Sequence, residues 1–238
     1  MHTPKKNICS IIKQHCLLCD AVLSDNLNIC EACRADLPWL THQCERCALP
    51  LANAEQHPIC AQCQASPPSF DSVTSVFRYA FPIDKLLQKT KLANNSYHLN
   101  WLAACLYSKI SLNPLPEAII FVPHSKSRLL SKGYNQGEYL AVQLARLTQL
   151  EIAWHVCRKH RETQRQSDLS GKSRRQNLKH AFQCPDHNYR HLAIVDDTMT
   201  TGATVSEIST ELKKSGAHTV DIWVLARTAS DHHKTHRN

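Results

Sequence analysis

The chain has 238 residues, of which 42% are hydrophobic, and its formal net charge is +8. This length is long for one hydrophobic core and comfortable for two. No apolar run approaches the ~18 residues of a transmembrane helix, so we expect a soluble protein without a membrane span.

Four Cys-x-x-Cys pairs follow one another near the N-terminus and contain eight of the twelve cysteines. Two such pairs make one tetrahedral thiolate site, and Zn²⁺ suits that site because it needs no redox chemistry. The spacing therefore predicts two structural zinc ions, held in closed sites where catalysis at the metal is not expected. The predicted ligands are Cys16, Cys19, Cys30, Cys33, Cys44, Cys47, Cys60 and Cys63.

Other uses of these cysteines are open at this point. A disulfide framework is typical of secreted domains, but the N-terminus does not resemble a signal peptide, because Lys13 and His15 interrupt its apolar stretch. An iron–sulfur cluster also takes four thiolates, although the even spacing favours paired zinc ribbons. A dithiol redox role would need only one pair. Reduced thiols and the missing signal place the chain in the cytoplasm.

The connector after the last cysteine pair contains Pro67 and Pro68, which stiffen it. We therefore expect a zinc-ribbon domain over residues 1–66 and a second domain over residues 70–230.

Beyond the connector, strands alternate with helices, which is the pattern of an α/β domain. Strands separated by helices run parallel with right-handed crossovers, and ligands bind such sheets at the carboxyl ends of the strands. Strands are predicted over residues 73–79, 118–122, 151–156, 191–195 and 219–225, and helices over residues 83–92, 99–110, 136–150 and 205–215.

Two basic stretches are expected near the carboxyl ends of these strands. The segment Pro123–Arg128 follows a predicted strand and combines Lys126 and Arg128 with small polar groups, which suits a pyrophosphate; a solvated surface loop is the alternative. The segment Arg158–Phe182 has eight Lys or Arg and two acids, and so supplies +6 of the formal +8. Composition alone predicts a mobile basic loop there.

The segment His191–Thr204 reads HLAIVDDTMTTGAT, an apolar strand followed by two acids and a Thr/Gly turn before an amphipathic helix. N–H groups of a first helical turn and threonine hydroxyls can converge on one phosphate, and Gly202 permits close backbone approach. Asp196 and Asp197 are placed to accept hydrogen bonds from ribose hydroxyls. The segment predicts a site for a phosphorylated sugar, with an N-capped loop as the alternative. The threonines are Thr198, Thr200, Thr201 and Thr204.

This segment resembles the phosphoribosyl pyrophosphate (PRPP) motif of type I phosphoribosyltransferases. With the four cysteine pairs, the segments Val122–His124 and Gly133–Gln136, and the stretch from Thr163 to Asn177, it makes the chain similar to the ComF/GntX family nearly end to end. The resemblance implies an α/β type I phosphoribosyltransferase fold, a parallel sheet flanked by helices, preceded by a small double zinc-ribbon domain.

The resemblance also implies ligands and roles. PRPP would bind with Mg²⁺, its ribose on Asp196 and Asp197, its 5′-phosphate on Thr200–Thr204, and its pyrophosphate on Lys126 or Arg128. A flexible hood over PRPP would include Gln164, Arg165, Arg174 and Asn177. No residue is assigned as a base for the acceptor.

The family implies a role in natural transformation and in the use of external DNA as a nutrient. A phosphoribosyltransferase is one hypothesis, with its acceptor unassigned. The other is a non-catalytic PRPP sensor that engages single-stranded DNA, DNA-uptake proteins or recombination proteins through its basic surface. Aromatic residues, which stack on single strands, make up only 6% of the chain and favour the first hypothesis. A nucleoside-level salvage enzyme unrelated to DNA uptake stays open.

Overall fold

The computed structural model describes residues 15–229 apart from residues 24–27, 91–96, 112, 162–177 and 179. The chain divides into two compact units, Met1–Leu37 and Pro38–Asn238. The first unit contains the first two cysteine pairs, and the second contains the other two pairs together with the sheet. The proline-containing connector predicts a boundary near residue 66, whereas the third and fourth cysteine pairs belong to the same compact unit as the sheet.

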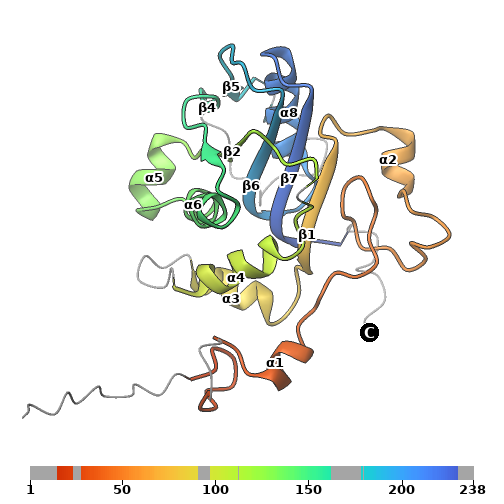
Figure 1. Ribbon diagram of the computed structural model, residues 1–238, viewed down its shortest axis with the longest axis vertical. Helices are drawn as coiled ribbons and strands as arrows, with labels where there is room; N and C mark the ends of the chain where they lie inside the picture. The colour runs from red at the N-terminus through yellow and green to blue at the C-terminus, as the bar shows by residue number, and fades with distance from the viewer. Residues whose placement is uncertain are drawn as a thin grey trace, which may run out of the picture. The chain divides into compact units, whose positions relative to one another are not determined.

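The second unit is built on a parallel sheet of five strands in the order β1-β7-β6-β2-β3 (Figure 1). Its central strands β6 and β7 are buried along most of their length, as expected for a sheet covered on both faces. The expected α/β fold is therefore confirmed. The strands are β1 (Ser72–Arg78), β2 (Ala118–Phe121), β3 (Glu151–Ile152), β6 (His191–Met199) and β7 (Thr219–Arg227).

Helices cover both faces of this sheet. Helices α4 and α6 pack against each other and against the sheet, and both lie in crossovers that run from β1 toward β3. Helix α8 connects β6 to β7 in the opposite direction, so a right-handed crossover places it on the other face. Among the described residues no helix combines the length and the apolar character needed to cross a bilayer. The helices are α1 (Glu31–Ala35), α2 (Ala61–Ala65), α3 (Ile83–Lys89), α4 (Tyr97–Tyr107), α5 (Lys126–Lys132), α6 (Gln136–Thr148) and α8 (Ala203–Lys214).

Several elements differ from the sequence-based expectations, and the strand expected over residues 151–156 is shortened to β3. Helix α5 occupies residues expected to form a loop, because Ser125 caps it by accepting a hydrogen bond from the N–H of Arg128 at 3.4 Å. Strand β6 continues to Met199 because its pairing with β7 extends through Thr198 and Ala226. A small antiparallel pair, β4 (Arg158–Lys159) and β5 (Phe182–Gln183), borders the basic segment.

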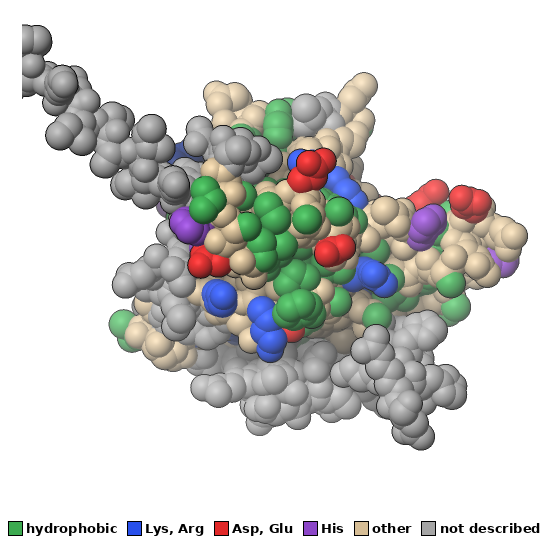
Figure 2. Space-filling view, turned by 90° about the horizontal axis from the view of Figure 1, so that it is seen from below, with side chains coloured by type: hydrophobic (Ala, Val, Ile, Leu, Met, Phe, Trp, Pro, Cys, Tyr) green, Lys and Arg blue, Asp and Glu red, His purple; other side chains and the backbone are tan. Residues whose placement is uncertain are grey.

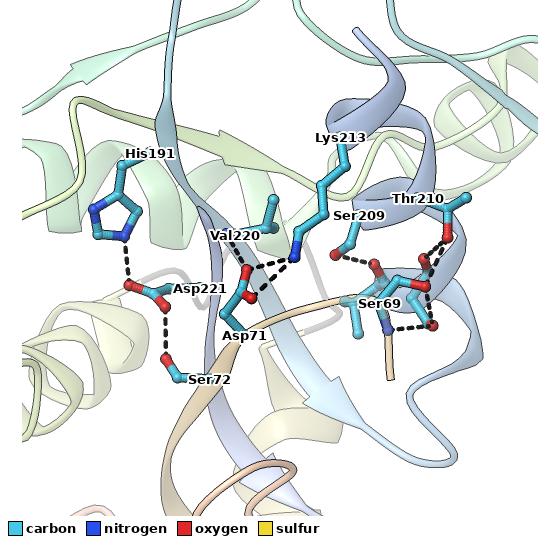
Figure 3. A network of polar contacts seen from close by, with 11 residues as sticks. Ser69, Asp71, Ser72, His191, Ser209, Thr210, Lys213, Val220 and Asp221 are labelled. Carbon is cyan, nitrogen blue, oxygen red and sulfur yellow. Dashed lines mark hydrogen bonds and ion pairs between the residues drawn. The ribbon is translucent and has the colours of Figure 1, made fainter. Parts of the chain in front are cut away.

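A polar network ties the amino ends of β1, β6 and β7 together (Figure 3). The carboxylate of Asp221 accepts a hydrogen bond from Ser72 at 2.6 Å and lies 2.7 Å from Nε2 of His191. Asp71 accepts from the N–H of Val220 and from Lys213. This network fixes strand register at the edge of the sheet opposite to the one where ligands bind such folds.

Each Cys-x-x-Cys pair forms a tight turn called a knuckle, and the third and fourth knuckles are part of the main hydrophobic core. Their cysteines are buried and belong to one continuous cluster with residues of β6, β7 and α8. The chain leading to them runs beside β1, where the N–H of Leu40 donates to Val76 O at 2.9 Å and the N–H of Arg78 donates to Pro38 O at 2.8 Å. This half of the cysteine array and the sheet therefore share one core.

Candidate functional site

The paired carboxylates lie near the carboxyl end of β6, between β2 and β7. Asp196 and Asp197 are both partly buried. Oδ1 of Asp196 accepts a hydrogen bond from the N–H of Asp197 at 2.9 Å, and Oδ1 of Asp197 accepts from the hydroxyl of Thr198 at 3.2 Å. Each carboxylate has oxygens beyond these contacts that can accept hydrogen bonds from a sugar hydroxyl.

The N-terminus of α6 lies against this pair. Asn135 caps the helix by accepting from the N–H of Gly137 at 3.0 Å, and its amide donates to Val122 O at 3.0 Å. A Cβ at Gly137 would lie 3.3 Å from Val195 O and 3.6 Å from Oδ1 of Asp196. Glycine therefore permits the positive end of the helix dipole to approach the carboxylate.

The electrostatics mark Asp196 as an unusual carboxyl group. Burial raises its pKa well above the ordinary value, and the adjacent carboxylate of Asp197 raises it further, while the charge of Arg128 opposes this shift. Burial also raises the pKa of the Tyr134 hydroxyl, and the charge of Asp197 adds to that effect. A carboxyl group whose pKa is shifted by both burial and a specific neighbouring charge is a candidate for a functional site.

The turn after β6 leads directly into α8. Thr200 and Thr201 are exposed, and Oγ1 of Thr201 accepts from the N–H of Ala203 at 3.3 Å. Gly202 has a left-handed backbone with φ of 75°, and a Cβ there would come within 2.5 Å of the Met199 side chain. The turn therefore needs glycine. It also lies at the N-terminus of α8, where free N–H groups and the positive end of the helix dipole favour a bound anion.

We expect Asp196→Asn to stabilise the fold rather than weaken it. The amide keeps an oxygen for the N–H of Asp197 but removes a partly buried charge and its repulsion with the carboxylate of Asp197. The melting temperature should therefore rise by about 2–4 °C for each ~1 kcal/mol gained. Because the folded-state pKa of Asp196 is raised, its cost is absent at acid pH and grows as the pH rises.

Thermal denaturation across a pH series measures this effect. The matched control is Asp221→Asn, which removes a carboxylate bonded to Ser72 and His191 and should lower the melting temperature. A destabilised Asp196→Asn would indicate that Asp196 supports the fold instead of a ligand.

The eight knuckle cysteines form two separate clusters. The sulfur atoms within each cluster all lie within 4.8 Å of one another, and the pairs combine in sequence order: Cys16, Cys19, Cys30 and Cys33 form one site, and Cys44, Cys47, Cys60 and Cys63 form the other. The described cysteines are free thiols, so the disulfide alternative is not supported there.

The geometry of each cluster fits zinc. Tetrahedral Zn–S bonds of about 2.3 Å separate the sulfur atoms by about 3.8 Å. The Sγ atoms of Cys19 and Cys30 lie 3.7 Å apart, as do those of Cys47 and Cys60. The repeat also extends to the backbone, because the N–H of Cys30 donates to the sulfur of Cys16 at 3.4 Å, and the N–H of Cys60 donates to that of Cys44 at 3.3 Å.

These backbone donors favour the thiolate form that a metal needs. Burial opposes ionisation of Cys16 and Cys44, but the N–H groups outweigh it and lower the pKa to about 6 for Cys16 and about 7 for Cys44. Both clusters are closed Cys₄ sites of the zinc-ribbon type and fit structural Zn²⁺.

The structure brings most of the predicted sugar-phosphate residues together along β6 and the start of α8. Thr204 is the second residue of α8, and Arg128 lies on the exposed face of α5. Lys126 begins α5, but its side chain lies outside the described part of the structure. The predicted hood residues also lie outside the described residues; they are Gln164, Arg165, Arg174 and Asn177.

Sequence reasoning missed three residues that shape the site. Asn135 and Gly137 could have been found from the cap signal of an Asn before an amphipathic helix. Arg227, the last residue of β7, is 4% exposed and donates hydrogen bonds to the carbonyl groups of Met199 and Thr200. A basic residue that ends an apolar strand is usually exposed to solvent. The sequence therefore gives no sign that Arg227 is buried.

Comparison with known proteins agrees with this architecture. The family model "Double zinc ribbon domain" matches residues 10–64. Competence protein F of Haemophilus influenzae is 34% identical over 84% of this chain and 90% of its own, and DNA utilization protein YhgH of Escherichia coli O157:H7 is 33% identical over 90% and 96%. The crystal structure of TT1426 from Thermus thermophilus aligns with 56% of this chain and 84% of its own, at 12% identity and a TM-score of 0.33, too weak a likeness to support an argument.

Proposed function

The chain belongs to the ComF/GntX family, that of competence protein F and DNA utilization protein YhgH, and from this premise we propose that it is a PRPP-binding phosphoribosyltransferase acting in DNA uptake or in the use of DNA as a nutrient. The reaction would take place in the cytoplasm, with Mg²⁺ bound alongside PRPP. The acceptor is left unassigned because acceptor pockets in one fold are built from variable loops.

The observation that carries this proposal is the continuity of the two ligand-binding parts. Asp196 and Asp197 follow the buried run Leu192–Val195 of β6, and three residues after Asp197 the turn Thr200–Gly202 leads into α8. A ribose 5-phosphate is bifunctional in the same way, with vicinal hydroxyls at one end and a phosphate at the other. One ligand of this kind satisfies the acids and the helix N-terminus together.

Each group has a defined task in this proposal. The carboxylates accept hydrogen bonds from the 2′- and 3′-hydroxyls, and the turn binds the 5′-phosphate through backbone N–H and threonine hydroxyl groups. Arg128, whose charge already acts on Asp196, neutralises charge on the departing pyrophosphate. Mg²⁺ supplies further neutralisation of that leaving group when it is bound.

The test of catalysis is release of pyrophosphate from PRPP in the presence of a panel of bases, nucleotides and DNA ends. An acceptor-dependent release would support a transferase. PRPP binding without release for any acceptor would favour the second hypothesis, a PRPP sensor.

The competing DNA-binding hypothesis draws on the basic segment Arg158–Phe182. On the face seen in Figure 2, the described Lys and Arg side chains are interspersed with acidic and hydrophobic ones. A single-stranded DNA surface would instead combine a basic groove with aromatic side chains on which bases stack. The basic segment is therefore the part of the chain that separates the two hypotheses.

We expect neutralisation of Arg165, Arg174 and Arg175 to weaken PRPP binding or turnover strongly if these residues cover the ligand. If they bind nucleic acid, the same variant should keep its PRPP affinity, lose single-stranded DNA affinity and show a flatter salt dependence. Both affinities should be measured on the one triple variant. Normal PRPP affinity beside lost DNA binding would replace the transferase proposal with the sensor.

A further inference from the structure

The guanidinium of Arg227 lies between the second cysteine cluster and the turn that opens α8. Its Nε donates to the carbonyl of Cys47 at 2.9 Å. Its Nη1 shares two N–H groups among three carbonyl oxygens: Met199 O at 3.2 Å, Thr228 O at 3.0 Å, and the carbonyl of Thr200. One buried side chain thus holds a metal-ligand residue on one side and the first residue of the turn on the other.

We propose that Arg227 is a positioning residue through which the zinc site formed by Cys44, Cys47, Cys60 and Cys63 holds the Thr200–Gly202 turn in its binding conformation. The turn's ligand rests on the proposed function above, but the coupling between metal and turn does not. The second zinc ribbon is then part of the ligand-binding machinery as well as a structural module.

The charges of the two partners match. A Zn²⁺ ion with four thiolates carries a net charge of −2, and a buried charge of that size requires a positive partner or several hydrogen-bond donors. Arg227 is 4% exposed and places a positive charge beside the cysteines of this cluster. Burial lowers the pKa of Arg227, and the nearby sulfur atoms of the cluster oppose that effect.

The path from the metal to the turn consists of short, buried contacts. Cys47 would bind the metal through its sulfur while its carbonyl accepts from Arg227. The Met199 carbonyl accepts both from Arg227 and from the N–H of Thr228. The Met199 side chain in turn packs against Gly202, the residue that caps α8.

Arginine is required for this task because its planar fork carries several donors in fixed directions. A lysine keeps the charge but presents a single ammonium group on a flexible stem. It cannot reach Cys47 O and the carbonyls of Met199 and Thr200 with one geometry. Arg227→Lys therefore separates the bridging role from simple charge neutralisation.

The experiment is amide hydrogen exchange over residues 199–206 in the full-length zinc-loaded protein. Arg227→Lys and Cys60→Ser should each accelerate exchange in this segment by about tenfold or more. The first change removes charge-assisted hydrogen bonds on the path, and the second removes a ligand of the metal site from which the path starts. The matched controls are Arg78→Lys, at the exposed end of the neighbouring strand, and Cys30→Ser, at the equivalent position of the first cluster. Neither control should change exchange in this segment.

Unchanged exchange at residues 199–206 in Arg227→Lys, with the rest of the sheet still protected, would overturn the proposal. Should Cys60→Ser fail to fold, extraction of zinc from the wild-type protein by a chromogenic chelator gives the same information. The turn should then lose protection in step with the second zinc ion and not with the first.

Coupling of binding free energies is reciprocal, so PRPP with Mg²⁺ should raise the equilibrium affinity of the protein for one of the two zinc ions several-fold. This measurement separates the two proposals. Faster exchange in Arg227→Lys without any effect of PRPP would retain the role of Arg227 and reject PRPP as the ligand. PRPP binding with no change of exchange in Arg227→Lys would retain PRPP as the ligand and reject the role of Arg227.

Discussion

Replacing both acids, in Asp196→Asn with Asp197→Asn, should lower the affinity for PRPP and Mg²⁺ by at least about 100-fold, because two charge-assisted hydrogen-bonding groups are lost together. The fold should remain intact, since neither side chain forms an ion pair within the described structure and Asn keeps an acceptor for the N–H of Asp197. Isothermal titration of both proteins measures the change.

The control is Asp36→Asn with Asp186→Asn, which removes two exposed acids and leaves the strand end untouched. Its PRPP affinity should equal that of the wild-type protein. Equal affinity in the Asp196/Asp197 variant would show that the paired acids do not bind the ligand.

Loss of the second zinc site should cost far more stability than loss of the first. Binding of structural zinc is worth about 10–16 kcal/mol in small zinc modules, comparable with the whole stability of a domain. The second cluster is buried in the core that includes the sheet. We therefore expect Cys44→Ser with Cys60→Ser to lower the melting temperature of the sheet-containing unit by about 10 °C or more.

The equivalent change in the first cluster, Cys16→Ser with Cys30→Ser, is the matched control. It alters the unit Met1–Leu37 and should leave the main unfolding transition almost unchanged. Elemental analysis should find close to two zinc ions in the wild-type protein and one in each variant. Iron with visible absorbance, or equal destabilisation by both variants, would contradict this account.

The order and type of the main strands and helices followed from the sequence because each carries its own signal. The apolar runs of β2, β6 and β7 have the composition of buried parallel strands, and α6 and α8 have helical spacing and recognisable ends. Helix α5 was missed because the preceding serine cap was interpreted as part of a polar loop. The extension of β6 through Asp196 and Asp197 was missed because strand ends depend on pairing with a neighbour.

The residues of the site likewise fall into those that the sequence predicts and those that it does not. The acids, the threonine turn and the cysteine knuckles are contiguous in sequence, so local pattern was sufficient to find them. Arg227 donates a hydrogen bond to Cys47 across 180 residues, and Asn135 donates one to Val122, the residue that follows strand β2. Contacts of this kind depend on the packing of distant segments, and no local pattern indicates them.

The most direct measurement of the central claim is a crystal structure of the protein with Mg²⁺ and PRPP. The account predicts the 5′-phosphate on the turn Thr200–Gly202 and the first turn of α8, with the ribose hydroxyls on Asp196 and Asp197. PRPP bound elsewhere, or a turn empty at saturating PRPP, would contradict it.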